Sequence, residues 1–286
     1  MIRTAVLAAA AMLGFAANSL LCRAGLRGGA IDAASFTAIR LVTGACVLVA
    51  ITLARPVPTP AVARPGTWRS ALALAAYAVA FSYAYLQLEA GAGALLLFGA
   101  VQLTMVAGGL LRGERPTALQ WIGWIVALAG LVVINAPGID PPPAGGALLM
   151  IAAGVAWGVY SLRGRGVTNP LPTTAGNFVR TIPIAALLVV VAIVAGARVS
   201  ARGIALAAAS GGIASGLGYT LWYAVVPALG ATRAAAIQLS VPVIAAAAAI
   251  ALLGESLRPT LAVGGAAIIC GLALALRATA RVKAGS

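Results

Sequence analysis

A glycine–glutamate pair followed by two further glycines occurs twice in the chain, at identical spacing. The first copy is Gly113, Glu114, Gly123 and Gly130, and the second is Gly254, Glu255, Gly264 and Gly271. At roughly the same offset between the copies, Arg40 matches Arg180, and each of these arginines lies inside an apolar segment. A repeat that extends over half the chain indicates a fold built from two similar units.

The segments around these repeated residues are too apolar for a protein that folds in water. Hydrophobic residues make up 62% of the 286 residues and charged residues 8%, against about 45–50% and 25% in soluble domains. Lipid offers no hydrogen-bond partners to the backbone, so the spanning segments must be helices. Ten segments have the length needed to cross a bilayer. They are about 4–22, 33–54, 70–88, 92–111, 118–136, 145–162, 174–196, 204–224, 232–253 and 260–277.

We therefore predict an all-α integral membrane protein with ten transmembrane helices in one structural body. Residues 1–138 form the first repeat and 139–286 the second. Each repeat holds five spans, and because five is odd the second repeat enters the membrane from the opposite face. Such a 5+5 inverted-topology repeat is typical of secondary transporters. Loop arginines such as Arg55, Arg64, Arg112 and Arg163 favour cytoplasmic N- and C-termini.

Composition also excludes several classes of function. The net charge of +14 is spread over short loops, which indicates topology signals and contacts with membrane lipids rather than a nucleic-acid surface. The chain has no histidine, and Cys46 and Cys270 lie in apolar spans, where we expect them to be small packing residues. Without an assembled nucleophile–base pair or acid pair, we predict no enzyme, no metal and no cofactor. The expected partners are a small-molecule substrate and lipids.

The repeated glycines and glutamates suit the ends and contact faces of membrane helices. Glycine favours a helix C-terminus, and Glu114 and Glu255 can each face the positive end of the following helix. We interpret both glutamates as structural clamps that join consecutive helices, with a coupling-ion site as the alternative. The glycine stripes predict close helix packing, between the halves or across a dimer; we expect a monomer or a weak homodimer.

Arg40 and Arg180 each lie about seven residues into a span, roughly 10 Å deep. An intramembrane arginine is costly and needs a partner or a task. Three interpretations stay open, namely snorkelling to the interface, a structural contact, and a gate or a contact to a substrate carboxylate. Pro183 and Pro242 are expected to kink their helices and to provide hinges.

The spans carry no Asp, Glu, His or Lys near their centres, which disfavours exchange of organic cations for protons. A neutral or zwitterionic solute needs aromatic walls and a few uncharged polar groups. Mid-span residues of these types are the candidate cavity residues. They are Phe15, Asn18, Tyr77, Phe81, Tyr85, Phe98, Gln102, Trp157, Tyr160, Tyr219, Trp222 and Gln238. Trp121, Trp124 and Tyr223 fit an interfacial belt instead.

Three features together resemble the EamA module of the drug/metabolite transporter superfamily. They are the Gly-Glu pair at a helix end with its following glycines, an aromatic patch in the first helix of each half (Phe15 to Asn18 and Trp157 to Tyr160), and the arginine of the second helix. The resemblance implies a ten-helix exporter of small metabolites in the bacterial inner membrane, closest to the aromatic amino-acid exporters. It implies a cavity between the first, third, fourth, sixth, eighth and ninth spans.

On these grounds we expect export of small neutral or zwitterionic metabolites, namely amino acids, by alternating access without ion coupling. A drug, nucleoside or other metabolite carried by the same fold, with or without protons, is the alternative.

Overall fold

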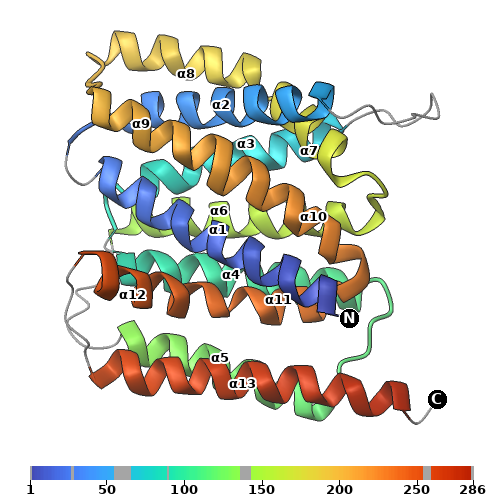
Figure 1. Cartoon of the computed structure of the whole chain (residues 1–286). Helices are drawn as coiled ribbons and strands as arrows, with labels where there is room; N and C mark the ends of the chain where they lie inside the picture. Colours follow the sequence, from blue (N-terminus) through green and yellow to red (C-terminus); the bar gives the residue numbers. More distant parts are fainter. Residues whose placement is uncertain are drawn as a thin grey trace.

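The computed structural model describes residues 2–26, 29–54, 66–88, 90–135, 143–253 and 259–284. Its helices lie side by side and cross one common layer, with both chain ends on the same side of that layer (Figure 1). The α1 helix begins on the side where α6 ends, so these two helices cross the layer in opposite directions.

In the first half, each predicted span corresponds to one helix. The helices are α1 (Ile2–Leu26), α2 (Ala33–Ala54), α3 (Trp68–Ala84), α4 (Ala90–Leu110) and α5 (Ala118–Asn135). Polar residues start two of them. The Thr67 side chain accepts a hydrogen bond from the Ser70 N–H at the start of α3, and Asp32 Oδ1 accepts one from the Ser35 N–H at the start of α2.

In the second half, three of the five predicted spans are divided. The elements are α6 (Ala144–Arg163), a short 3-10 turn (Gly164–Gly166), α7 (Pro170–Val179), α8 (Ile182–Val194), α9 (Ala201–Ala209), a π-helical segment (Ser210–Leu217), α10 (Gly218–Leu229), α11 (Ala231–Gln238), α12 (Ser240–Leu253) and α13 (Pro259–Ala284).

The divisions have local causes. The break between α7 and α8 precedes Pro183, and the break between α11 and α12 precedes Pro242, since proline lacks the N–H that would continue the ladder of hydrogen bonds. The π-helical segment contains Gly211, Gly212 and Gly216. A π-helix of this length is rare and is frequently found at a functional site.

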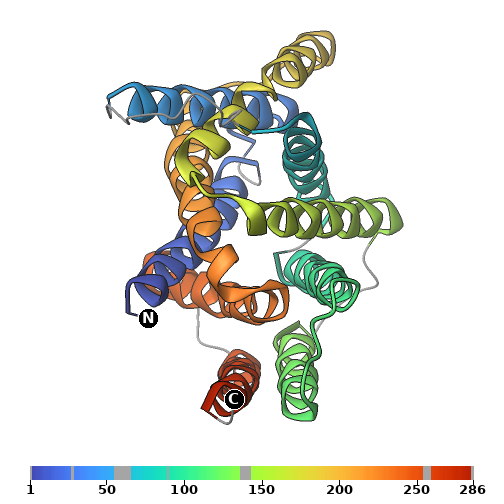
Figure 2. The same ribbon diagram turned by 90° about the vertical axis from the view of Figure 1, so that its right-hand side faces the viewer.

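The two halves pack closely against each other. At one edge of the molecule α5 lies against α13, as both views show (Figure 2). A Cβ atom added to Gly123 would lie 2.5 Å from the Gly271 carbonyl oxygen, and one added to Gly130 would lie 2.6 Å from that of Gly264. The repeated glycines therefore serve contact between the halves within one chain.

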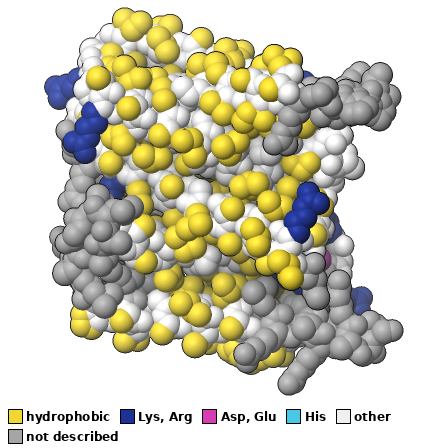
Figure 3. Space-filling model, viewed as in Figure 1, with side chains coloured by type: hydrophobic (Ala, Val, Ile, Leu, Met, Phe, Trp, Pro, Cys, Tyr) yellow, Lys and Arg dark blue, Asp and Glu magenta, His cyan; other side chains and the backbone are white. Residues whose placement is uncertain are grey.

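The outer surface is that of a membrane protein. Within the described ranges, five helices are long and apolar enough to span a bilayer, and shorter apolar stretches include Leu96–Leu110 and Ala118–Val133. Mid-helix side chains such as Leu103, Leu187 and Ile213 are more than half exposed. Figure 3 shows hydrophobic side chains over most of the described part of this face, with arginine side chains toward the helix ends.

The expected side-chain positions of four residues are wrong. Trp124 and Tyr223 do not belong to an interfacial belt but are buried, Trp124 in α5 and Tyr223 with its hydroxyl donating to the Tyr160 carbonyl at 2.9 Å. Cys46 and Cys270 are exposed toward the lipid instead of packed inside. Apolar spans have two kinds of apolar surroundings, lipid and protein, and composition alone does not separate them.

Candidate functional site

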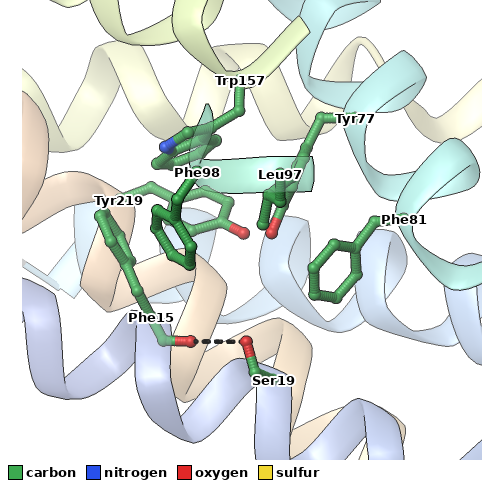
Figure 4. Close-up of a pocket in the computed structure, with 8 residues that line it drawn as sticks. All are labelled: Phe15, Ser19, Tyr77, Phe81, Leu97, Phe98, Trp157 and Tyr219. Atoms are coloured by element: carbon green, nitrogen blue, oxygen red, sulfur yellow. Dashed lines mark hydrogen bonds between the residues drawn. The ribbon is translucent and has the colours of Figure 1, made fainter. Parts of the chain in front are cut away.

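A small cavity lies in the middle of the helix layer, and aromatic rings form most of its wall. It is lined by Phe15 and Ser19 of α1, Tyr77 and Phe81 of α3, Leu97 and Phe98 of α4, Trp157 of α6 and Tyr219 of α10 (Figure 4). The space open to the centre of a water-sized sphere is about 20 Å³, room for about one water molecule. A larger solute therefore requires the rings to separate.

The rings hold one another in place. The Trp157 ring lies 5.0 Å from Phe15, 5.0 Å from Tyr77 and 4.6 Å from Tyr219, measured between centroids. Phe81 lies 5.3 Å from Tyr77. These edge-on and tilted contacts each add about 0.5–1.5 kcal/mol to the free energy of burial. Because the rings belong to several helices, moving one helix changes the cavity.

Uncharged polar groups form a second layer around the rings. Asn18 is buried, donates to the Tyr77 hydroxyl at 3.4 Å and accepts from Ser210 Oγ at 2.6 Å and Ser215 Oγ at 3.4 Å. Ser210 and Ser215 belong to the π-helical segment, so this segment supplies partners to the amide that faces the cavity wall.

On the other side of the cavity, Gln238 of α11 supports Trp157. Its Oε1 accepts from the indole N–H at 2.5 Å, and its Nε2 lies 2.9 Å from Met105 Sδ. Trp222 is buried one layer further out and donates to Ser161 Oγ at 2.9 Å. Hydrogen bonds of this kind fix the orientation of buried indole rings.

Gln102 is a buried amide without a hydrogen-bond partner among the described residues. It is 3% exposed, and neither its Oε1 nor its Nε2 is bonded. On α4 it lies between Phe98, which lines the cavity, and Met105, which contacts Gln238. An unpaired buried amide costs about 1–3 kcal/mol, so Gln102 is available to a ligand or a water molecule.

Arg40 of α2 is 1% exposed and lies behind the cavity wall. Its Nε donates to Ser215 Oγ at 2.9 Å and its Nη2 to the Tyr219 hydroxyl at 2.5 Å. The guanidinium carbon lies 5.3 Å from the Tyr77 ring centroid and 5.7 Å from that of Phe81. The side chain therefore does not snorkel to the interface.

Arg180 occupies a different environment from Arg40 despite the sequence match. It is partly exposed, and its Nη1 donates to the Gly176 carbonyl of its own helix at 2.8 Å. The two environments differ because α7 ends at Val179, whereas α2 continues unbroken past Arg40.

Glu114 binds the other half of the molecule rather than the helix that follows it. Its two carboxylate oxygens accept from the Ala231 N–H at 2.9 Å and the Thr232 N–H at 3.0 Å, at the start of α11. Arg165 pairs with the same carboxylate at 2.7 Å. Burial raises the pKa of Glu114, but these N–H groups and Arg165 lower it more, so the net pKa lies below its ordinary value. Glu255 lies outside the described residues.

Asp32 makes a comparable clamp at the opposite side of the layer. Its Oδ1 accepts from the Ser35 N–H at 2.8 Å and its Oδ2 from the Arg198 N–H at 3.2 Å. Burial acts to raise the pKa of Asp32, yet these bonds leave it below its ordinary value. An isolated antiparallel bridge between Ile31 and Val199 joins the same two loops. Each side of the layer thus has a carboxylate that ties the two halves together.

Six of the twelve candidate cavity residues line the cavity, and the others support it. The lining residues are Phe15, Tyr77, Phe81, Phe98, Trp157 and Tyr219. Asn18, Tyr85, Tyr160, Trp222 and Gln238 contact this group from behind, and Gln102 is described above. Sequence reasoning missed Ser19 and Leu97. Ser19 follows Asn18 directly, which was a usable signal, whereas nothing distinguishes Leu97 from other apolar positions.

Comparison with known proteins gives independent evidence on the family and the fold of the chain. The model of the EamA-like transporter family matches twice, over residues 2–136 and 144–277. An uncharacterized protein of Pseudomonas aeruginosa is 53% identical over 96% of this chain and 94% of its own length. The uncharacterized inner membrane transporter YedA of Escherichia coli is 25% identical over 38% of this chain and 35% of that protein. A solved crystal structure shares the fold, with a TM-score of 0.78 over 96% of this chain and 98% of that one, at 21% identity.

Proposed function

Because the chain belongs to the EamA-like transporter family, we propose that it exports small neutral or zwitterionic metabolites, and amino acids in particular, by alternating access. The family places it among membrane transporters of small molecules rather than enzymes. It is a multi-pass protein of the bacterial inner membrane. The substrate, the direction and the mechanism are the parts that we propose.

The observation that carries the proposal is the central cavity with its aromatic wall, behind which uncharged amides form a second layer. Rings of Phe15, Phe98 and Trp157 suit an apolar side chain. Behind the rings, the unpaired amide of Gln102 and the hydrogen-bonded amide of Asn18 carry donors and acceptors that a polar main-chain portion can reach once the rings separate. An amino acid with an apolar or aromatic side chain combines these two needs in one small molecule.

The positions of the described carboxylates support transport without proton coupling. Asp32 and Glu114 both lie at helix ends, where backbone N–H groups hold them ionised. A proton-coupled carrier needs an acid that gains and loses its proton within the pathway. We therefore propose a uniporter, in which the solute gradient alone drives net flux.

The interrupted helices of the second half provide the moving parts in this proposal. The breaks before Pro183 and Pro242 and the π-helical segment next to Tyr219 are points where backbone angles can change. The contacts of Asp32 and of Glu114 lie at opposite sides and would alternate between formed and broken. We propose a monomer as the working unit, since the glycine stripes face each other inside one chain.

The test is efflux from proteoliposomes that hold the purified protein and labelled phenylalanine, threonine or methionine. Flux is measured with and without a pH gradient, against protein-free vesicles. A Leu13→Ala variant, altered at a side chain that is 59% exposed toward the lipid, is the matched control for Phe15→Ala. We expect flux without a pH gradient, lost in Phe15→Ala and kept in Leu13→Ala.

Strict dependence on the pH gradient would overturn the uniport proposal. No flux of any amino acid, together with flux of a dye or a nucleoside, would refute the proposed substrate class and favour the alternative cargo.

A further inference from the structure

The guanidinium of Arg40 is a buried positive charge for which the described residues supply no carboxylate. Asp32 and Glu114, the acidic side chains among them, are engaged by other groups at helix ends. Two of the three guanidinium nitrogens are bonded, to Ser215 and Tyr219. The third, Nη1, is buried and has no partner within the described part of the chain.

The charge lies directly behind the cavity wall. Tyr77 and Phe81 present their rings to the guanidinium, with centroids 5.3 and 5.7 Å from its central carbon, and Tyr219 accepts its hydrogen bond. All three residues also line the cavity (Figure 4). Contact with ring faces stabilises a cation but does not neutralise it. The same three side chains therefore separate the cavity from a cation that none of the described carboxylates neutralises.

Close backbone packing fixes the position of Arg40. A Cβ atom on Gly211 would lie 2.1 Å from the Arg40 carbonyl oxygen, so the glycine allows the π-helical segment to approach α2. This approach brings Ser215 to the Arg40 side chain. An arginine held in this way at membrane depth, with no counterion among the described residues, is best explained by a function that needs its charge.

We propose that Arg40 binds the carboxylate of the transported solute, an assignment that rests on the proposed function and specifies its substrate class. A carboxylate can take two parallel hydrogen bonds from Nη1 and Nη2. In doing so it would replace the Tyr219 hydroxyl on Nη2 and supply the partner that Nη1 lacks. The rings of Tyr77, Phe81 and Tyr219 must separate for this contact, which also enlarges the cavity.

The assignment gives a rule for substrates. A free carboxylate is required, whereas an ammonium group is dispensable, because none of the described residues that line the cavity is acidic. Four compounds that share a phenyl ring test the rule. They are phenylalanine, hydrocinnamate (which lacks the ammonium group), phenethylamine (which lacks the carboxylate) and phenylalaninamide (whose carboxylate is an uncharged amide).

The experiment has two readouts on the full-length protein. The first is competition of each compound with labelled phenylalanine in proteoliposome exchange, and the second is the rise in Tm that each causes in detergent. We expect phenylalanine and hydrocinnamate to act at concentrations about tenfold or more below those of the other two, the effect of one good charged contact. Arg40→Gln should abolish the preference, and Arg40→Lys should retain it with weaker binding. Arg202→Gln, at an exposed position of α9, is the matched control and should behave as the unaltered protein.

The two readouts separate the two proposals. Carboxylates that raise the Tm in an Arg40-dependent way, without any flux, would refute transport of these solutes and support the Arg40 site. Phenethylamine as effective as hydrocinnamate, a preference that persists in Arg40→Gln, or no binding of either carboxylate would overturn the assignment. If Arg40→Gln fails to fold, the compound series on the unaltered protein decides.

Discussion

Replacing Glu114 by Gln should weaken the attachment of α11 to the first half of the protein. The carboxylate accepts two backbone N–H groups and pairs with Arg165. Glutamine keeps the shape, but its amide nitrogen cannot accept, so one N–H at the start of α11 loses its partner. The remaining bond also loses its charge. The Glu114 side chain is 21% exposed, so water moderates the loss.

The expected loss in the free energy of unfolding is about 1–2 kcal/mol, in the range of a lost helix cap. For a chain of this size, 1 kcal/mol corresponds to about 2–4 °C in Tm. We therefore expect Tm to fall by about 2–8 °C at pH 7. The matched control is Arg112→Gln, an exposed side chain of the same loop, for which the change should stay within about 0.5 kcal/mol.

The pH dependence provides a second and sharper test. The folded pKa of Glu114 lies below its ordinary value of 4.5, so its contribution is complete above that pH and is lost as the pH falls through the folded pKa. The Tm difference between the unaltered protein and Glu114→Gln should therefore shrink below about pH 4.5. The assay is thermal unfolding in detergent, followed by the fluorescence of the buried tryptophans Trp124, Trp157 and Trp222. Equal Tm values at pH 7, or a difference that stays constant into acid, would refute the reasoning.

Three further perturbations test other parts of the structure. Gly211→Ala places a Cβ 2.1 Å from the Arg40 carbonyl oxygen and should lower the free energy of unfolding by at least about 2 kcal/mol. The control Gly99→Ala, whose added Cβ would have no atom within 4 Å, should leave Tm nearly unchanged. An equal effect of the two substitutions would contradict the close packing of Gly211 against Arg40. Trp157→Phe removes the donor to Gln238 and should cost about 1–3 kcal/mol in thermal stability, and no measurable cost would show that this bond is unimportant. Asp32→Asn should lower Tm at pH 7 but not below the folded pKa of Asp32, which lies under its ordinary 3.8; a loss independent of pH would contradict a role for its charge.

Sequence alone predicts the spans well because bilayer length and apolar composition act on each segment separately. Each predicted span contains one helix or a set of consecutive shorter ones, and the interruptions before Pro183 and Pro242 follow from the missing N–H. The π-helical segment was not predicted. Its cause is the fit of Gly211 and Ser215 against Arg40, which is a property of the packed molecule.

The candidate site, too, can be predicted from the sequence only in part. Aromatic and amide residues at mid-span depth indicate the cavity region, since polar groups in lipid must face protein or water. Which of them form the wall depends on helix rotation, so Tyr160 and Trp222 lie behind it while Leu97 lines it. Partners across the two halves, such as Glu114 with α11, depend on tertiary arrangement and leave no local signal.

The most direct test of the account is whether the aromatic cavity opens to each side of the membrane in turn. The measurement is labelling of a Ser19→Cys variant, with the three native cysteines replaced by serine, by a membrane-impermeant maleimide from either side of the vesicle. Leu13→Cys, on the lipid-facing side of the same helix, serves as the control. The account predicts labelling of Ser19→Cys from both sides at rates that a transported solute lowers, and none of Leu13→Cys. Absence of labelling from both sides, or labelling that no solute affects, would contradict it.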